Sequence, residues 1–316
     1  MATSIVTGGA GFIGSHLCER LLQEDHEVIC IDNLITGRRA NIKHLLQSHK
    51  FSFIQHNVAK PFETNEKIDF IFHLASPASP DRYQENPIDT ISANAFGSHN
   101  FLVLAKRSGA KFLLASTSEV YGDPQVHPQP ESYWGNVNPN GIRSCYDESK
   151  RVAEAIVMAF VRAHNVNARI IRIFNTYGPR MNSADGRVIP NFITQALASQ
   201  PLTIYGNGTQ TRSFCYVSDL IEGACKAMFL ENTKGEVINL GNPIEFTVRE
   251  LANTITSITK TNSEISFRPL PQDDPIKRKP DISKAIRILN WEPKISLQDG
   301  LHSTINYFKQ ELGVSK

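Results

Sequence analysis

Short apolar runs alternate with longer amphipathic stretches through the first half of the chain. The runs have the length and composition of buried strands: Ala2–Thr7, His26–Asp32, Phe51–Asn57, Ile68–Ala75, Lys111–Ser116 and Ala168–Phe174. Patterns typical of helices lie between them: Phe12–Leu22, about Thr90–Ser108, and Cys145–His164. Because parallel strands are joined by crossover helices, this alternation predicts an α/β fold with a Rossmann-type, doubly wound parallel sheet.

After Tyr177 the alternation loosens. The Asn- and Gly-rich passage from Gly178 to Gly208 is expected to be irregular, and Pro269–Pro280 to be extended because its prolines restrain the backbone. The remaining patterns predict two strands and three helices: Glu236–Leu240 and Glu264–Arg268, then Val248–Ile258, Ile282–Leu289 and Leu297–Leu312. We expect residues 1–178 with about 214–241 to form the sheet domain. Residues of about 179–213 and 242–316 are expected to form a smaller C-terminal α/β substrate lobe over the carboxyl edge of the sheet.

Composition narrows the function classes. The 33 basic and 31 acidic residues give a net charge of +2, too near neutral for a general nucleic-acid or membrane-surface binder. No apolar stretch approaches the ~18 residues of a membrane span, and the N-terminus carries no secretory leader. The five cysteines form no CxxC pair, and the histidines show no metal-ligand spacing. We therefore expect a cytoplasmic enzyme that holds no metal.

A glycine motif follows the first predicted strand and opens the first helix. Its glycines are Gly8, Gly11 and Gly14. They permit a tight turn, let backbone approach a pyrophosphate, and let the helix pack closely on the strand, while the helix N-terminus offers amide donors. Asp32, at the end of the second strand, can accept the hydroxyls of an adenosine ribose, and capping a loop is its alternative role. The motif predicts NAD rather than NADP, although Arg38 and Arg39 weaken that preference.

Tyr146 and Lys150 are four residues apart at the start of a long predicted helix, so their side chains share a face. A neighbouring ammonium and a positively charged nicotinamide both favour the phenolate, which can remove a proton from an alcohol. A YxxxK pair alone is a frequent accident, but after a dinucleotide motif it becomes specific. Thr117, at the end of the fifth strand, is the candidate to hydrogen-bond the oxygen being oxidised, ahead of Ser118; Ser116 is expected to be a turn residue.

Longer segments spread over nearly the whole chain carry a more specific pattern. They are Gly8–Leu17, His73–Pro80, Ser116–Pro124, Tyr133–Pro139 (YWGNVNP), Cys145–Glu148, Phe174–Met181, Asp185–Val188, Gln210–Phe214, Asp273–Pro275 and Arg278–Ile282 (RKPDI). Through these segments the chain resembles the extended short-chain dehydrogenase/reductase family of NAD-dependent epimerases and dehydratases. Within that family it is most similar to the UDP-glucuronic acid decarboxylases, to which the YWGNVNP and RKPDI segments are much more specific than the cofactor motif.

The resemblance implies an NAD-dependent carboxy-lyase that converts UDP-glucuronate to UDP-xylose through a UDP-4-keto intermediate, with NAD regenerated in each cycle. In the related 4,6-dehydratases an Asp-Glu pair typically follows the threonine, and simple 4-epimerases usually lack the carboxylate. The Thr117-Ser118-Glu119 triplet matches the decarboxylases. A 4,6-dehydratase or 4-epimerase acting on dTDP-glucose or a UDP-sugar is the alternative, and a non-catalytic NAD-sensing or scaffold protein is a third interpretation.

The resemblance also implies roles for individual residues. Tyr146 takes the proton of the sugar C4 hydroxyl, Thr117 stabilises the developing enolate, and Lys150 holds the nicotinamide ribose, while the role of Glu119 stays open. Contacts to NAD are expected from Gly8, Gly11, Phe12, Ile13, Gly14, Asp32, Asn33, Asn57, Val58, Leu74, Ala75, Tyr146 and Lys150. Asn57 departs from the family, which often has aspartate there to meet the adenine amino group; the amide carbonyl can still accept that hydrogen bond.

Contacts to the UDP-sugar are expected from a second set of residues. These are Pro77, Glu119, Asn175, Val188, Tyr205, Gln210, Arg212 and Arg278, with Tyr216 as a further helper. Arg278 is expected to meet either the diphosphate or the sugar carboxylate, and guanidinium groups suit both because they bind such anions in a bidentate manner. His73 is expected to be structural. The family also implies a homodimer through a helical bundle that includes the Tyr146 helix.

Overall fold

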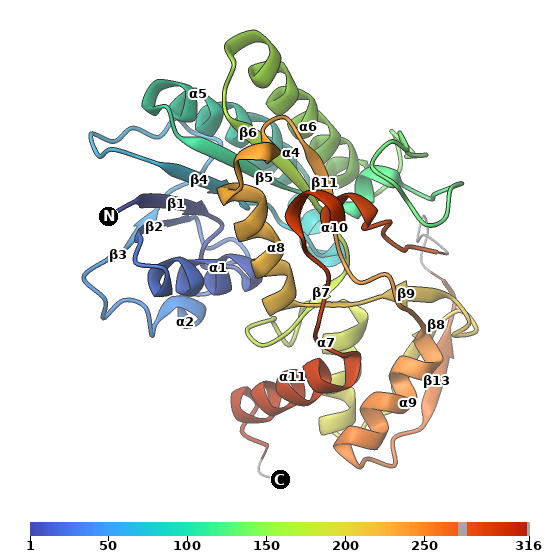
Figure 1. Ribbon diagram of the computed structural model, residues 1–316. Helices are drawn as coiled ribbons and strands as arrows, with labels where there is room; N and C mark the ends of the chain where they lie inside the picture. Colours follow the sequence, from blue (N-terminus) through green and yellow to red (C-terminus); the bar gives the residue numbers. More distant parts are fainter. Residues whose placement is uncertain (271–276, 315–316) are drawn as a thin grey trace.

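Seven parallel strands form the central sheet of the computed structural model, which describes residues 1–270 and 277–314 (Figure 1). They are β1 (Thr3–Thr7), β2 (Glu27–Asp32), β3 (Phe51–Gln55), β4 (Phe70–His73), β5 (Lys111–Thr117), β6 (Ala168–Ile173) and β11 (Val237–Leu240). Their order across the sheet is β11-β6-β5-β4-β1-β2-β3, so the winding direction reverses between β1 and β4. The predicted doubly wound, Rossmann-type fold is confirmed, and its switch point is where such folds bind ligands.

The two faces of the sheet have separate cores, because successive side chains of a strand point to opposite sides. On one face Val6 and Phe72 pack with α1, α8 and α10. On the other face Ile5 and Ile71 pack with α5 and α6. The bounds of these helices are α1 (Phe12–Gln23), α5 (Ser98–Ser108), α6 (Ser144–His164), α8 (Val217–Phe229) and α10 (Ser283–Leu289). Both faces are therefore covered, and the carboxyl edge of the sheet is left for a site.

A further apolar core lies in the lower part of Figure 1, where three helices pack beside a pair of parallel strands. These elements are α7 (Val188–Leu197), α9 (Val248–Thr259), α11 (Leu297–Glu311), β8 (Leu202–Tyr205) and β13 (Ile265–Arg268). Phe192, Leu251 and Phe308 bring the three helices together. A capping box between Thr247 and Glu250 starts α9 by satisfying amide groups at its N-terminus.

Several short elements complete the fold. They are α2 (Arg39–Ile42), α3 (Pro80–Glu85), the 3₁₀ turns η2 (Ser118–Tyr121) and η3 (Glu231–Thr233), and the strands β7 (Thr176–Tyr177), β9 (Thr211–Ser213), β10 (Cys215–Tyr216) and β12 (Glu245–Thr247). Strand β10 pairs with β7, and β12 pairs with β9. In the described part of the chain, no helix is both long and apolar enough to cross a membrane.

Three sequence predictions need correction. The passage Gly178–Gly208 is not irregular throughout, because it contains α7 and β8. No helix was expected at α8, although its buried residues Val217, Leu220 and Ala224 have helical spacing. The single helix expected over about Thr90–Ser108 is instead α4 (Pro87–Ser92), a π-helical turn η1 (Ala93–Gly97) and α5. Half of the stretch Pro269–Pro280 and the whole motif Asp273–Pro275 lie outside the described residues.

Candidate active site

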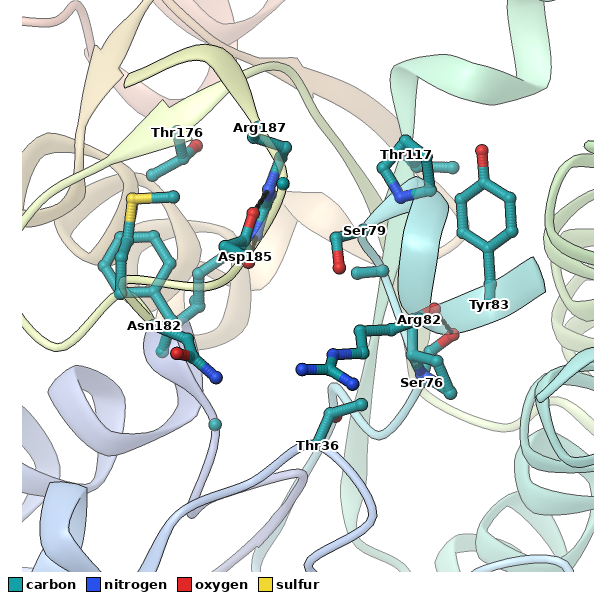
Figure 2. Close-up of a pocket in the computed structure, with 18 of the residues that line it drawn as sticks. Thr36, Ser76, Ser79, Arg82, Tyr83, Thr117, Thr176, Asn182, Asp185 and Arg187 are labelled. Carbon is teal, nitrogen blue, oxygen red and sulfur yellow. Dashed lines mark hydrogen bonds and ion pairs between the residues drawn. The ribbon is translucent and has the colours of Figure 1, made fainter. Parts of the chain in front are cut away.

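A cleft of about 550 Å³ opens at the carboxyl edge of the central sheet (Figure 2). In Figure 2, Ser79 and Thr117 lie on one side of it, Asp185 and Arg187 on the other, and Arg82 extends between them. With the exception of Tyr216, all residues predicted above to contact NAD or the sugar nucleotide or to act in catalysis line this cleft. The fold thus brings together residues from Gly8 to Arg278 that are far apart in the sequence, while their individual roles remain predictions.

The glycine turn is built for close approach. Gly8 has a φ of +71°, and a side chain there would put its Cβ 2.8 Å from the backbone nitrogen of Ala75. A Cβ on Gly14 would lie 2.2 Å from the Gly8 carbonyl oxygen, so the helix start can only pack this tightly on the turn with glycine. Gly11 donates its backbone N–H to that same oxygen at 3.0 Å. A pyrophosphate fits at this turn, against the N-terminus of the twelve-residue helix α1.

Asp32 is buried at the end of β2 and held by two backbone amides. Its carboxylate accepts from Ala10 at 3.0 Å and from Leu34 at 2.8 Å. Burial raises the pKa of Asp32, and these two amide donors act against that rise. Because it lines the cleft beside the glycine turn, this carboxylate fits the ribose hydroxyls of NAD and would repel the extra phosphate of NADP.

The two arginines that weaken the NAD preference both have partners. Arg38 forms an ion pair with Glu311 on α11 and also donates to Tyr307 at 3.4 Å. The guanidinium of Arg39 lies over the ring of Phe53, 4.8 Å from its centroid. Arg39 is thereby held away from the cleft lining, whereas Arg38 lines the cleft with its guanidinium paired to Glu311. The ion pair of Arg38 favours NAD, because it occupies the charge that a 2′-phosphate would need.

Asn57 also lines the cleft, at the turn after β3. Its side-chain carbonyl, which was expected to meet the adenine, accepts the backbone N–H of Ala59 at 3.0 Å. A carbonyl oxygen has two lone pairs, so one acceptor position is left for the nucleotide.

Tyr146 and Lys150 lie on the buried face of α6, next to the end of β5. Lys150 donates from Nζ to the backbone carbonyl of Ala115 at 2.8 Å, and Nζ lies 5.9 Å from the centroid of the Tyr146 ring. Burial lowers the pKa of Lys150 to about 7, while the nearby Glu154 acts in the opposite direction. Burial raises the pKa of Tyr146, and a hydrogen bond with Thr117 opposes the rise. The phenol is therefore protonated in the free protein, and an added positive charge is needed to make it a base.

Glu119 lies between two guanidinium groups that are far apart in the sequence, those of Arg143 and Arg278. Arg143 donates from Nη2 to Oε2 of Glu119 at 2.6 Å, and Arg278 forms an ion pair with Oε1. Arg278 is 4% exposed, and it also donates to the carbonyl of Gly122 at 3.2 Å. Burial raises the pKa of Glu119, but the charges of Arg278 and Arg143 outweigh it and hold this pKa below its ordinary value. Asp147 adds a second carboxyl group near these charges, and burial with the charge of Glu119 raises its pKa to about 7, so the corner keeps a partial positive charge at neutral pH.

Several residues of the cleft could not be identified from the sequence. Arg143 stands only three positions before Tyr146, and that closeness was the available signal. Tyr83 lies just beyond a segment that carried the family resemblance, yet only the fold reveals its stacking on Tyr146. Arg187 donates to Asp185, with Nη2 2.9 Å from Oδ2, and Figure 2 shows both against the cleft.

Three other residues discussed above make contacts with neighbouring side chains of the protein. The Nδ1 atom of His73 lies 2.8 Å from the Thr7 hydroxyl, and burial lowers the pKa of His73 to about 3, so the ring is neutral. Ser116 donates to Glu154 at 2.6 Å as part of a buried polar network. Tyr216 does not belong to the cleft lining; its ring packs on Tyr177 with centroids 5.5 Å apart. For Tyr216, the expectation of a helper at the substrate finds no support in the geometry.

Comparison with known proteins identifies relatives over nearly the whole chain. Residues 4–241 match the sequence model of the NAD dependent epimerase/dehydratase family. The chain is 55% identical over 313 residues to UDP-glucuronic acid decarboxylase 6 of Arabidopsis thaliana, covering 99% of this chain and 90% of the relative. It is 52% identical over 308 residues to UDP-glucuronic acid decarboxylase 1 of Danio rerio, covering 98% and 73%.

A solved structure has the same fold. The crystal structure of UDP-glucuronic acid 4-epimerase from Bacillus cereus, in complex with UDP-glucuronic acid and NAD, is similar with a TM-score of 0.89 and 30% identity. The match covers 98% of this chain and 99% of that one. The Bacillus cereus structure contains both a nucleotide sugar and NAD, which shows that a protein with this fold can bind the two together.

Proposed function

Because the chain belongs to the NAD dependent epimerase/dehydratase family, we infer that it is an NAD-dependent enzyme that decarboxylates UDP-glucuronate to UDP-xylose. The observation that carries this inference is the pairing of Glu119 with Arg143 and Arg278 close to Tyr146 and Thr117. A substrate carboxylate next to the reacting carbon requires positive charge, and this corner offers the two guanidinium groups of Arg143 and Arg278. A neutral hexose has no group that needs this arrangement.

The chemistry follows from the position of the carboxylate. NAD⁺ held at the glycine turn would supply the acceptor for the hydride of the sugar C4 and the donor that restores this hydride after decarboxylation. Tyr146 removes the C4 hydroxyl proton, and loss of this proton together with the hydride leaves a ketone at C4, bonded directly to the C5 that carries the carboxylate. The C5–carboxylate bond then breaks as CO₂ leaves, and its electron pair moves onto the C4 oxygen. The enolate electrons then return to C5, which takes a proton from water. The overall change is replacement of the carboxylate by a proton at C5, so no net oxidant is consumed.

Each polar residue near the reacting carbons has a task that its position allows. Tyr146, once protonated, donates to the C4 oxygen together with Thr117, and this stabilises the enolate. Lys150 is held against the carbonyl of Ala115, and its ammonium form lowers the pKa of the adjacent phenol. Glu119 holds the two guanidinium groups at the end of the cleft. Arg278 therefore serves the sugar carboxylate in this proposal, while Arg212 and Asn175 serve the diphosphate.

The direct test is product identification. Incubation with UDP-glucuronate should release CO₂ and yield UDP-xylose without accumulation of NADH. A UDP-hexuronate inverted at C4 would indicate an epimerase, and turnover of dTDP-glucose with loss of water would indicate a dehydratase. A Tyr146→Phe variant should lower kcat by about 10²- to 10⁴-fold, and unchanged turnover would remove the proposed base.

The proposed assembly is a homodimer. Apolar side chains on α4, η1, α5 and α6 are exposed on one side of the molecule: Ile88, Ile91, Phe96, Val103 and Val152. Contiguous exposed apolar surface of this kind usually marks a protein interface, and a second copy would bury it in a bundle that includes the Tyr146 helix. All five cysteines are free thiols, which supports the cytoplasm, a reducing compartment, as the location.

A further inference from the structure

Gln129 is fully buried and binds the segment that follows Arg278. Its backbone N–H donates to the carbonyl of Lys279 at 2.9 Å, and its side-chain Oε1 accepts the N–H of Lys279 at 2.9 Å. Its own carbonyl accepts the N–H of Asp281 at 3.0 Å. These three hydrogen bonds fix the backbone directly after Arg278, on both sides of Pro280.

Asn239 ties this contact to the central sheet. From β11, its Nδ2 donates to the carbonyl of Gln129 at 2.9 Å and to the carbonyl of Asp281 at 3.1 Å. Its Oδ1 accepts the hydroxyl of Tyr121 at 2.8 Å, which orients the amide. Both Gln129 and Asn239 are 0% exposed, so water cannot replace these bonds without rearrangement.

The segment held in this way directly follows Arg278, whose guanidinium must be placed at the cleft. Arg278 reaches Glu119 by an ion pair and the Gly122 carbonyl by a 3.2 Å hydrogen bond. An arginine side chain has several rotatable bonds, so its head is placed only when its backbone is also fixed. Gln129 supplies that fixation from a loop that lies outside the cleft lining.

We propose that Gln129, supported by Asn239, is a positioning residue that holds Arg278 against Glu119 for the decarboxylation. Gln129 does not line the cleft, so it acts through Arg278 rather than on the substrate. The proposal rests on the function proposed above. Small misplacements of a catalytic group lower rates by up to about 10²-fold, so loss of Gln129 should lower kcat by about 10- to 100-fold.

The test uses two substitutions and a matched control. Gln129→Met keeps the volume and Gln129→Ala removes it, but both delete the acceptor for Lys279. Gln195→Met is the control, because Gln195 similarly accepts the Thr203 N–H at 3.0 Å and donates to its hydroxyl at 3.2 Å. Gln195 itself lies outside the cleft lining, and its partner Thr203, which lines the cleft, keeps its own side chain in the control. Both Gln129 variants should lower kcat for UDP-glucuronate while their NAD content stays normal, and Gln195→Met should remain within about two-fold of the wild type.

A double-mutant cycle separates positioning from general stability. In an Arg278→Lys background, Gln129→Met should change kcat by less than about three-fold, because the group it positions is already altered. Equal losses in both backgrounds would overturn the proposal, as would normal kcat in Gln129→Met.

Hydrogen exchange gives a readout that does not depend on activity. Exchange at the Lys279 and Asp281 amides should accelerate in Gln129→Met and stay unchanged in Gln195→Met. Unchanged exchange in the Gln129 variants would also overturn the proposal. Failure of both variants to fold would overturn it too, because Gln129 would then be needed for stability and not for positioning. If the wild-type chain leaves UDP-glucuronate intact, the proposed function fails, whereas accelerated exchange would still show that Gln129 holds this segment.

Discussion

The rings of Tyr83 and Tyr146 lie face to face, with centroids 4.9 Å apart and planes only 4° from parallel. Tyr83 comes from the short helix α3, which starts at Pro80 where the proline needs no amide partner. Tyr146 comes from α6, and its hydroxyl is hydrogen-bonded to Thr117. The stacking partner therefore fixes the plane of the ring, and Thr117 fixes the direction of its hydroxyl.

Removing the stack should slow catalysis without removing the base. Tyr83→Leu should lower kcat about 10-fold, because an aromatic pair contributes about 0.5–1.5 kcal/mol to the orientation of Tyr146. Tyr83→Phe keeps the ring and should stay within about two-fold, since the Tyr83 hydroxyl has no hydrogen-bond partner among the described residues. Steady-state kinetics with UDP-glucuronate checks both variants, and a large loss in Tyr83→Phe would show that the hydroxyl itself acts.

The contrast between Asp32 and Tyr83 explains how much of the site could be predicted. Asp32 and the glycine turn lie at strand ends, where a local motif carries the chemistry and the parallel sheet fixes the location. Tyr83 contacts Tyr146 across sixty-three positions of sequence, and no local pattern encodes that contact. The family resemblance identified Glu119 and Arg278 as residues of the site, but the fold was needed to pair them.

The same distinction holds for the fold. The strands that form the sheet were predicted because their short apolar runs are bounded by turns. The helices α7 and α8 were missed, although Val217 and Leu220 begin an amphipathic pattern that was available in the sequence. The π-helical turn η1 could not be predicted, because an extra residue in a helical turn leaves no distinct signal in apolar spacing.

Arg143 should control the ionisation of Glu119. Burial raises the pKa of Glu119, and only the charges of Arg278 and Arg143 bring it below its ordinary value. Arg143→Met should therefore raise that pKa, so that Glu119 becomes protonated at a higher pH than in the wild type. The acidic limb of the pH profile of kcat/KM should move upward by about one to two pH units.

The control for that experiment is Arg20→Met, which removes an equal charge from a surface pair with Glu24. This variant should leave the acidic limb in place, because exposed ion pairs have little effect on buried groups. An unmoved limb in Arg143→Met would contradict the assignment of Arg143 to Glu119.

Lys150 should make the stability of the nucleotide-free protein increase with pH. Burial lowers its pKa from 10.5 to about 7 in the folded state. Between these values the unfolded chain binds more protons than the folded one, so the free energy of unfolding rises with pH. The destabilisation is complete below about pH 7 and fades as pH approaches 10.5.

The Lys150→Met variant has no titrating group at this position, so comparing it with the wild type isolates the contribution of Lys150 to the pH dependence of stability. Urea unfolding at a series of pH values should show the variant to be the more stable near pH 7, with the gap narrowing by a few kcal/mol toward pH 10. The accompanying loss of the bond to Ala115 does not depend on pH and shifts the curves by a constant. Parallel stability curves for the two proteins would contradict a lowered pKa of Lys150.

Phe96 should be decisive for the proposed dimer. Its side chain is 61% exposed on η1, and the neighbouring helices α5 and α6 carry the exposed Val103 and Val152. A buried charge at the centre of an apolar interface is costly, so Phe96→Asp should convert the dimer to a monomer in size-exclusion chromatography with light scattering. Ile244→Asp is the matched control, because Ile244 is 60% exposed but lies before β12, away from these helices. A monomeric wild type, or a dimeric Phe96→Asp variant, would show that this face does not join two copies.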